Sequence, residues 1–296
     1  MMNMFAQSVP VRNEVLRLSC RGKRLTFEHP VVMGIINATP DSFSDGGQFF
    51  ELQDALSHAF KMIESGAQII DIGGETTKPN SDPTPEAEEL RRVIPLIEKI
   101  RERESSVIIS IDTNKSKVAA KALEQGADII NDISSLRFDE GMVDLLLDYP
   151  DVPIILMHMQ GTPRTMQANP QYDDVVSEIK TFFSERISYC LSKGIAQDRI
   201  VLDPGIGFGK NIEHNLEILR RLDEFHTFGV PILLGASRKR FINRIYPSEP
   251  QGRIVGSLAI TALAYYNKIQ IVRVHDVLEH VQLLKTFNAI YDQGRE

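Results

Sequence analysis

The feature that most constrains the fold of this chain is a strand-then-helix pattern that occurs eight times. Eight short runs rich in β-branched residues span 31–37, 69–73, 107–112, 129–132, 153–159, 200–204, 231–237 and 271–276. Amphipathic segments, which we expect to be helices, follow at 51–65, 85–104, 115–125, 139–148, 173–193, 212–226, 252–267 and 277–292. The runs show little apolar–polar alternation, which is typical of parallel strands buried on both faces.

Eight such units predict an α/β fold, a (β/α)8 TIM barrel, as one domain over residues 1–296. A faint internal repeat relates residues 64–72 to 124–133, which indicates one structural unit used more than once. The alternative with these elements is a doubly wound open sheet. Residues 15–28 precede the first unit and predict a short N-terminal β-hairpin extension that closes the bottom of the barrel.

Composition and charge narrow the class of protein. The formal net charge is −7, which argues against a nucleic-acid partner. No run is apolar enough for a membrane span or a signal peptide, so we expect a cytoplasmic protein without a membrane partner. Cys20 and Cys190 have neither metal-site spacing nor a disulfide framework, and we expect two inert thiols.

Nearly every predicted strand ends in a polar side chain that is able to bind a ligand. These side chains are Asn37, Asp71, Glu75, Asp112, Asn131, Asp132, His158, Asp203, Ser237, Lys239, Arg273 and His275. A single Asp after a strand is usually a helix cap. In a barrel, however, the carboxyl ends of all eight strands meet at one face, where the active site lies. The pattern therefore predicts one shared site.

The chemistry of this set indicates a ligand with two different parts. Four cationic or protonatable side chains suit an anion such as phosphate: Arg238, Lys239, Arg273 and His275. Asp112, Asp203 and Asn131 offer acceptors for the N–H edge of a flat heterocycle, such as the 2-aminopyrimidinone of a pterin or purine. Asn37 offers a hard oxygen that suits Mg²⁺. The alternative is a set of salt bridges that only closes the top of the barrel.

Two tempting motifs do not fit their usual functions. Residues 203–211, DPGIGFGKN, lack the spacing of a dinucleotide fingerprint or of a P-loop. We expect their glycines to let the backbone approach a ligand closely. His158 has no second His at helical spacing, which argues against zinc.

Several segments resemble the dihydropteroate synthase family of pterin-binding barrels. The matching segments are GIINATPDSFSDGG (34–47), GGETTKP (73–79), IDT (111–113), INDIS (130–134), MHMQGTPRTMQ (157–167), LDPGIGFGK (202–210), GASRK (235–239) and IVRVHD (271–276). They occur in the family's order between about residue 15 and residue 290.

The resemblance implies a transferase of folate biosynthesis. Such an enzyme condenses 6-hydroxymethyl-7,8-dihydropterin diphosphate with p-aminobenzoate, and it releases 7,8-dihydropteroate and diphosphate by dissociative displacement. It also implies a Mg²⁺ cofactor, inhibition by sulfonamides, and a homodimer that pairs through the helices within 252–292.

The resemblance also implies a role for individual residues. Those implied to hold the pterin are Asp112, Asn131, Asp203 and Lys239, with apolar contacts from Ile133, Met157 and Phe208. Those implied to bind diphosphate are Thr77, Arg273 and His275, with Asn37 on the metal and Asp45 ordering the first loop. Those implied near p-aminobenzoate are Lys78, Ser237, Arg238 and Lys239. The residues implied to act in catalysis are Asp112, Asp203, Lys239, Arg273 and His275.

The match has two departures at the site, and it leaves two functional alternatives. Lys78 stands where the family usually has Arg, and Arg240 follows Lys239 where some members have Ser. The alternatives are a corrinoid-linked pterin methyltransferase and a non-catalytic pterin-binding paralogue. We expect loops 38–50 and 74–84 to fold over the site, because long polar loops often serve as lids.

Overall fold

The chain forms a closed parallel barrel. The computed structural model describes residues 15–38, 47–76 and 82–291, with only the backbone described for 47–51. The strands are β3 (Val31–Asn37), β4 (Ile69–Gly73), β5 (Ile108–Asp112), β6 (Ile129–Asp132), β7 (Ile154–Met157), β8 (Ile200–Asp203), β9 (Leu233–Leu234) and β10 (Ile271–Val274). Their order is β8-β7-β6-β5-β4-β3-β10-β9. A parallel bridge between Leu202 and Ile232 joins β8 to the β9 segment, so the barrel prediction is confirmed and the open sheet is wrong.

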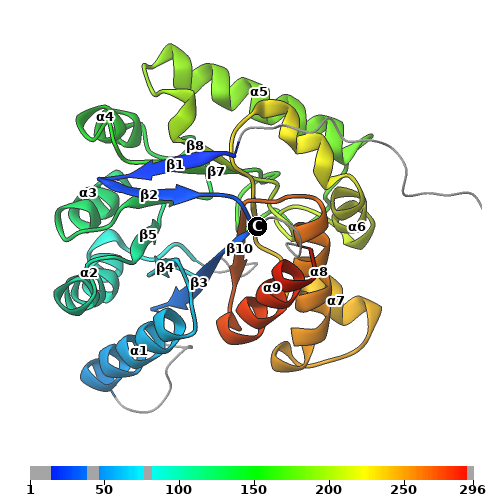
Figure 1. The fold of residues 1–296 in the computed structure, drawn as a ribbon. Coiled ribbons are helices and arrows are strands. Elements are labelled where there is room, and N and C mark those ends of the chain that lie inside the picture. Colours follow the sequence, from blue (N-terminus) through cyan, green and yellow to red (C-terminus); the bar gives the residue numbers. More distant parts are fainter. Residues whose placement is uncertain (1–14, 39–46, 77–81, 292–296) are drawn as a thin grey trace, which may run out of the picture.

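Helices surround the barrel on the outside (Figure 1). They are α1 (Gly47–Glu64), α2 (Glu86–Arg103), α3 (Ser116–Glu124), α4 (Gly141–Asp148), α5 (Val175–Ser192), α6 (Ile212–Arg220), α7 (Arg240–Ile245), α8 (Ile254–Tyr266) and α9 (Val277–Tyr291). Short 3₁₀ turns are η2 (Gln197–Arg199), η3 (Leu222–Phe228) and η4 (Pro250–Arg253). Within the described ranges, no helix is long and apolar enough to cross a membrane.

The internal repeat seen in the sequence corresponds to one helix ending used at two places. Gly66 after α1 and Gly126 after α3 have φ of 102° and 105°, a left-handed conformation that favours glycine. In both, the next residue donates its N–H five residues back, from Ala67 to the Met62 carbonyl and from Ala127 to the Ala122 carbonyl. This bonding satisfies the last helical carbonyls and turns the chain directly into the next strand.

Two predicted elements differ from the structure near the end of the chain. The predicted strand 231–237 is reduced to β9, because the chain leaves the ladder after Leu234 and turns at Arg238, whose φ is 57°. The predicted helix 212–226 ends at Arg220 and continues as the 3₁₀ turn η3. The short helix α7 has no counterpart among the predicted segments.

Strand geometry separates the inside of the barrel from the layer beneath the helices. Side chains alternate between the two faces of a strand. In β4, Ile70 and Ile72 join the large core between the strands and the helices, whereas Ile69 joins a separate cluster inside the barrel. The next inward position after Ile69 is Asp71, which is fully buried. In β10, the same step of two residues leads from Ile271 to Arg273. Polar groups therefore occupy the layer of the interior near the carboxyl ends of the strands, which we call the upper layer.

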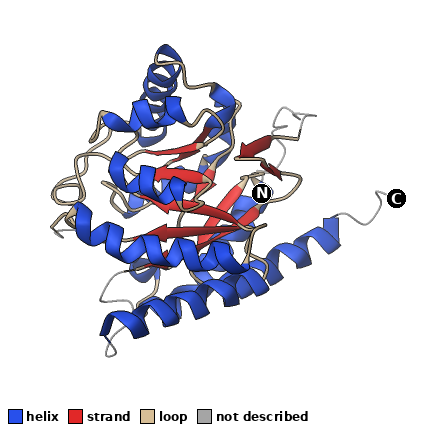
Figure 2. Cartoon of the chain, turned by 90° about the vertical axis from the view of Figure 1, so that its left-hand side faces the viewer, coloured by secondary structure: helices blue, strands red, loops and turns tan. Residues whose placement is uncertain are grey.

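The N-terminal hairpin closes the lower end of the barrel, as predicted from residues 15–28. β1 (Arg17–Cys20) pairs with β2 (Lys23–Thr26) across a two-residue turn, in which Arg21 and Gly22 have φ of 48° and 82°. Figure 2 shows this hairpin at one end of the barrel. Its apolar side chains belong to the interior cluster that holds the first residues of the barrel strands: Leu18, Cys20, Leu25, Phe27, Val31, Met33, Ile69, Ile108, Ile129, Ile155, Val201, Leu233 and Ile271.

We predict that Leu18→Ala destabilises the protein, because Leu18 is fully buried in this lower cluster. Truncation of a buried Leu costs about 2–5 kcal/mol. The matched control is Val15→Ala, since Val15 is 42% exposed, and surface changes stay within about 0.5 kcal/mol. Chemical denaturation of both variants measures the effect. Equal midpoints for Leu18→Ala and the unmodified chain would show that the hairpin does not seal the barrel.

Candidate active site

The centre of the upper layer is an ion-pair network around Arg273. The guanidinium donates from Nε to Asp71 Oδ2 at 2.6 Å and from a terminal nitrogen to Asp112 Oδ2 at 2.8 Å. These residues come from β10, β4 and β5, and 202 and 161 positions separate the paired residues along the chain. Strand register explains the meeting, because all three residues occupy inward positions at the carboxyl ends of their strands.

Asp71 is the main residue of this network that sequence reasoning left without a role. It is fully buried, and it also accepts from the Asn131 amide nitrogen at 3.2 Å. Asp71 therefore holds two predicted site residues, Arg273 and Asn131, in fixed orientations. Its position at the end of a buried strand was visible in the sequence, but nothing there distinguished it from a structural carboxylate.

Asp203 and Lys239 belong to the same site. Asp203 Oδ1 accepts from the Gly205 backbone N–H at 2.8 Å. Its Oδ2 atom and the side chain of Arg273 lie within 3.8 Å of the point where a Cβ on Gly235 would stand. Lys239 places its ammonium 4.2 Å from the centre of the Phe208 ring. The predicted convergence of Asp112, Asn131, Asp203, Lys239 and Arg273 is thus present in the structure.

Burial brings several of these groups close to titration at neutral pH. Burial raises the pKa of Asp112 to about 7, although the charge of Arg273 opposes the rise. Burial also raises the pKa of Asp203, against the Gly205 hydrogen bond. Burial and then the charge of Arg273 lower the pKa of Lys239 to about 8. The pKa of Arg273 is raised because the Coulombic attraction of Asp71 and Asp112 exceeds the cost of burial. Arg273 is therefore the fixed charge of the site.

His275 and Ser237 form a second pair next to this network. The Ser237 hydroxyl lies 3.1 Å from His275 Nδ1 and accepts from the His275 backbone N–H at 3.2 Å. Burial and the charge of Arg273 lower the pKa of His275 to about 3, so the ring is neutral at pH 7. Arg238 makes a two-pronged ion pair with Asp276, with Nε 2.9 Å from Oδ2.

The predicted apolar contacts also come together. Ile133 and Met157 form a buried cluster with Met159 and Met166, and Phe208 packs against it. The two further methionines were not predicted, although both lie in the MHMQGTPRTMQ segment. This cluster gives the site an apolar wall beside the polar acceptors, which suits a flat ring.

The expectation that the glycines of residues 203–211 approach a ligand is wrong for Gly205 and Gly209. A Cβ on Gly205 would stand 2.0 Å from the His158 carbonyl oxygen, and one on Gly209 would stand 2.7 Å from the Gln160 carbonyl oxygen. These glycines therefore allow two loops of the same chain to pack closely. Both have positive φ, 67° and 61°.

Asn37 stands exposed at the end of β3, with no side-chain hydrogen bond to another described residue. In the ranges that the structure covers, no group of three or more His, Cys, Asp or Glu is arranged to hold a metal ion. Asn37 offers one amide oxygen, a donor type that suits Mg²⁺, and an ion held there would take its other ligands from water and substrate.

Three predicted residues, Asp45, Thr77 and Lys78, lie outside the described residues, as do parts of the two predicted lid loops. The described start of the second loop is fixed by an ion pair. Glu75 pairs with Lys115, which also contacts the fully buried Glu89 at 2.5 Å.

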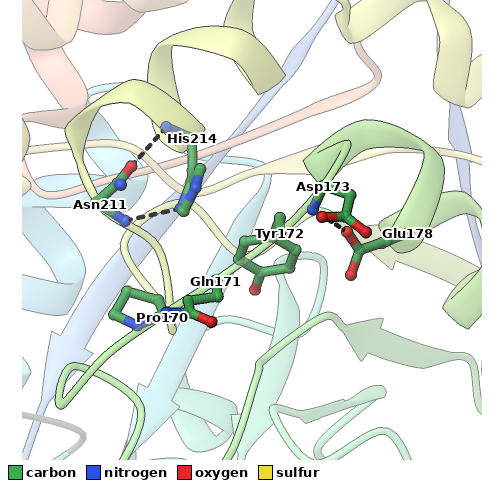
Figure 3. Close-up of a pocket in the computed structure, with 7 residues that line it drawn as sticks. All are labelled: Pro170, Gln171, Tyr172, Asp173, Glu178, Asn211 and His214. Atoms are coloured by element: carbon green, nitrogen blue, oxygen red, sulfur yellow. Dashed lines mark hydrogen bonds between the residues drawn. The ribbon is translucent and has the colours of Figure 1, made fainter.

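A polar pocket of about 490 Å³ is formed by residues of the β7–α5 and β8–α6 loops and of the helices that follow them (Figure 3). It is lined by Pro170, Gln171, Tyr172, Asp173, Glu178, Asn211 and His214, none of which is a predicted site residue. Asn211 and His214 bond to each other as the cap of α6 (Figure 3).

Comparison with known proteins agrees with this geometry. Residues 33–275 match the family model of pterin binding enzymes. Dihydropteroate synthase of Escherichia coli K12 is 47% identical over 274 residues, 93% of this chain and 96% of that protein.

Two crystal structures are similar throughout. The Yersinia pestis dihydropteroate synthase in a sulfonamide drug complex has a TM-score of 0.88 at 43% identity, and it covers 94% of this chain and 100% of its own. The Xanthomonas albilineans dihydropteroate synthase with 4-aminobenzoic acid also has a TM-score of 0.88, at 42% identity, with 96% and 100% covered. This chain belongs to the dihydropteroate synthase family of pterin-binding enzymes.

Proposed function

We propose that this protein is a dihydropteroate synthase. It would condense 6-hydroxymethyl-7,8-dihydropterin diphosphate with p-aminobenzoate, and release 7,8-dihydropteroate and diphosphate. The observation that supports this most is the meeting of Asp112, Asn131 and Asp203 around Arg273 at one end of the barrel. The relative solved with 4-aminobenzoic acid supports the second substrate.

The pterin would lie among the acceptors of the upper layer. Its N–H groups would donate to Asp112 and Asp203, whose carboxylates each retain an oxygen without a described hydrogen bond. Asn131 would complete this edge, and Lys239 would donate to a ring acceptor. Ile133, Met157 and Phe208 would pack against the ring.

The diphosphate would bind on the side of Arg273 and His275. An arginine has five N–H donors, and only two are used in the bonds to Asp71 and Asp112. The neutral His275 ring would donate from Nε2, because Nδ1 faces Ser237. We assign Thr77 to the same group, with Asp45 as the ordering residue of the first loop. Asn37 would hold Mg²⁺, which supplies positive charge to the leaving diphosphate when bound.

The reaction needs no protein nucleophile. The bond between the pterin methylene carbon and the diphosphate oxygen breaks, and its electron pair leaves with diphosphate. The arylamine nitrogen then bonds to that carbon and loses a proton. Asp112 and Asp203 would favour the cationic pterin between these events through their negative charge.

p-Aminobenzoate would approach from the side of Ser237, Arg238 and Lys239, with Lys78 from the second loop. Arg238 is engaged by Asp276, so we expect it to shape this pocket through its backbone as well as its charge. A relative was solved in a sulfonamide drug complex, which supports the expectation that such drugs inhibit this protein.

We also propose a cytoplasmic homodimer. Helix α8 buries the small polar residues Ser257 and Thr261, whereas Val255 and Tyr266 are 69% and 62% exposed. A large apolar surface on a helix usually marks an interface. Both cysteines are buried and free, in agreement with a reducing compartment.

The first prediction from this proposal concerns the reaction itself. Protein supplied with pterin diphosphate and p-aminobenzoate should form dihydropteroate and diphosphate with Mg²⁺, and turnover should stop in EDTA and return on readdition of Mg²⁺. Chromatography of the product measures this. Transfer of a methyl group from a methylated pterin without condensation would favour the methyltransferase alternative. Retained turnover in EDTA would contradict the metal role of Asn37.

The second prediction concerns pterin recognition. Asp203→Asn should raise the pterin dissociation constant roughly 10- to 100-fold, because a charge-assisted hydrogen bond contributes about 1.5–3 kcal/mol. Calorimetry with 6-hydroxymethylpterin measures this. Asp198→Asn, at an exposed position in η2, is the matched control. An unchanged constant in Asp203→Asn would remove this residue from the pterin site.

The third prediction concerns assembly. Val255→Glu should convert the dimer to a monomer, because a carboxylate would be buried without a partner in the interface. Leu191→Glu on α5, where Leu191 is 48% exposed, is the control and should leave the dimer intact. Sedimentation velocity at micromolar concentration distinguishes the two species. A dimeric Val255→Glu protein would place the interface elsewhere.

A further inference from the structure

Lys210 is a buried lysine to which the proposed reaction assigns no role. Its side chain is almost fully enclosed, with 3% of the residue exposed. The ammonium lies 2.9 Å from His158 Nδ1, and it donates to the carbonyls of Gly205 and Phe208 at 2.9 Å each and of His158 at 3.3 Å. No carboxylate among the described residues pairs with Lys210, so it is not a conventional salt-bridge lysine.

These acceptors come from two different loops. His158 begins the loop between β7 and α5, and Gly205 and Phe208 belong to the loop between β8 and α6. The glycine positions allow this approach, because a side chain on Gly205 would collide with the His158 carbonyl. The loop therefore folds around its own lysine, and the ammonium joins it to the neighbouring loop.

Both loops carry groups of the site. The Gly205 carbonyl accepts a hydrogen bond from Lys210, and the Gly205 backbone N–H donates one to Asp203 Oδ1 at 2.8 Å. The Phe208 carbonyl accepts a hydrogen bond from Lys210, and the Phe208 ring lies under the Lys239 ammonium. His158 directly follows Met157 of the apolar wall. The buried ammonium of Lys210 is thus linked through the backbone to Asp203, to Phe208 and to the apolar wall.

We propose that Lys210 is a positioning residue that holds Asp203 and Phe208 in the geometry required for pterin binding. The inference rests on the proposed function, because it takes the pterin as the ligand of Asp203. Burial lowers the pKa of Lys210 to about 7, while the charge of Asp203 opposes this. The negative charge of Asp203 thus favours the ammonium form that the four acceptors need.

The test compares Lys210→Met with two controls. Lys210→Met keeps the length of the side chain and removes every donor, so it should raise the dissociation constant for 6-hydroxymethylpterin at least 10-fold and leave the KM for p-aminobenzoate within about threefold. Lys121→Met removes an exposed lysine on α3. Tyr172→Phe removes a hydrogen bond of 2.8 Å to the Gly209 carbonyl between the same two loops. Both controls should bind the pterin as the unmodified protein does.

Calorimetry well below the melting temperature separates positioning from stability. A lower melting temperature with unchanged pterin affinity in Lys210→Met would overturn the proposal, and so would an equal loss of affinity in Tyr172→Phe. If Lys210→Met does not fold, Lys210→Arg and Lys210→Gln decide: weaker pterin binding by Gln than by Arg supports positioning, and equal binding overturns it. Failure of the unmodified protein to bind the pterin would instead refute the proposed function.

Discussion

The site depends on the pairing of Arg273 with Asp71 and Asp112 inside the barrel. A buried charge without a partner costs several kcal/mol, so none of the three would be tolerated there alone. Together they form a network in which each group fixes the orientation of the others. With Asp203 and Lys239 the upper layer holds three carboxylates and two cations. Because the carboxylates outnumber the cations, this layer suits a neutral ring with many N–H donors better than it suits an anion.

The two-residue period of the strands explains why this network lies where it does. An inward residue near the start of each strand, such as Ile69 or Ile271, is apolar and packs against the hairpin. Two positions later the inward residue is Asp71 or Arg273. The hairpin therefore seals the apolar end of the interior, and the charged side chains of the site lie at the polar end. The residues that pack the barrel interior and the charged residues of the candidate site lie in different layers of the same strands.

This layering also decides how much the sequence could reveal. The meeting of Asp112, Asn131, Asp203 and Arg273 was predictable, because parallel strands of a closed barrel bring their carboxyl ends together. The hydrogen-bond partner of each group was not predictable. In a sequence, an Asp at a strand end that binds a ligand looks the same as one, such as Asp71, that orients neighbouring side chains. Gly205 and Gly209 were misassigned for a similar reason. Sequence shows that a backbone must be approached closely, but not whether a ligand or the His158 carbonyl approaches it.

The protonation of the site follows from its burial and ties binding to charge. The pKa of Asp112 is raised to about 7 and that of Lys239 is lowered to about 8, in each case mainly by burial. The pKa values of both groups are thus close to neutral pH, so a new hydrogen bond is enough to favour one protonation state over the other. Arg273 does not, because Asp71 and Asp112 raise its pKa. In the proposed complex, a pterin that donates to Asp112 would favour the carboxylate, and the carboxylate would in turn favour the ammonium of Lys239. The proposed ligand would therefore complete the charge pattern of the site, around a guanidinium that Asp71 and Asp112 already hold.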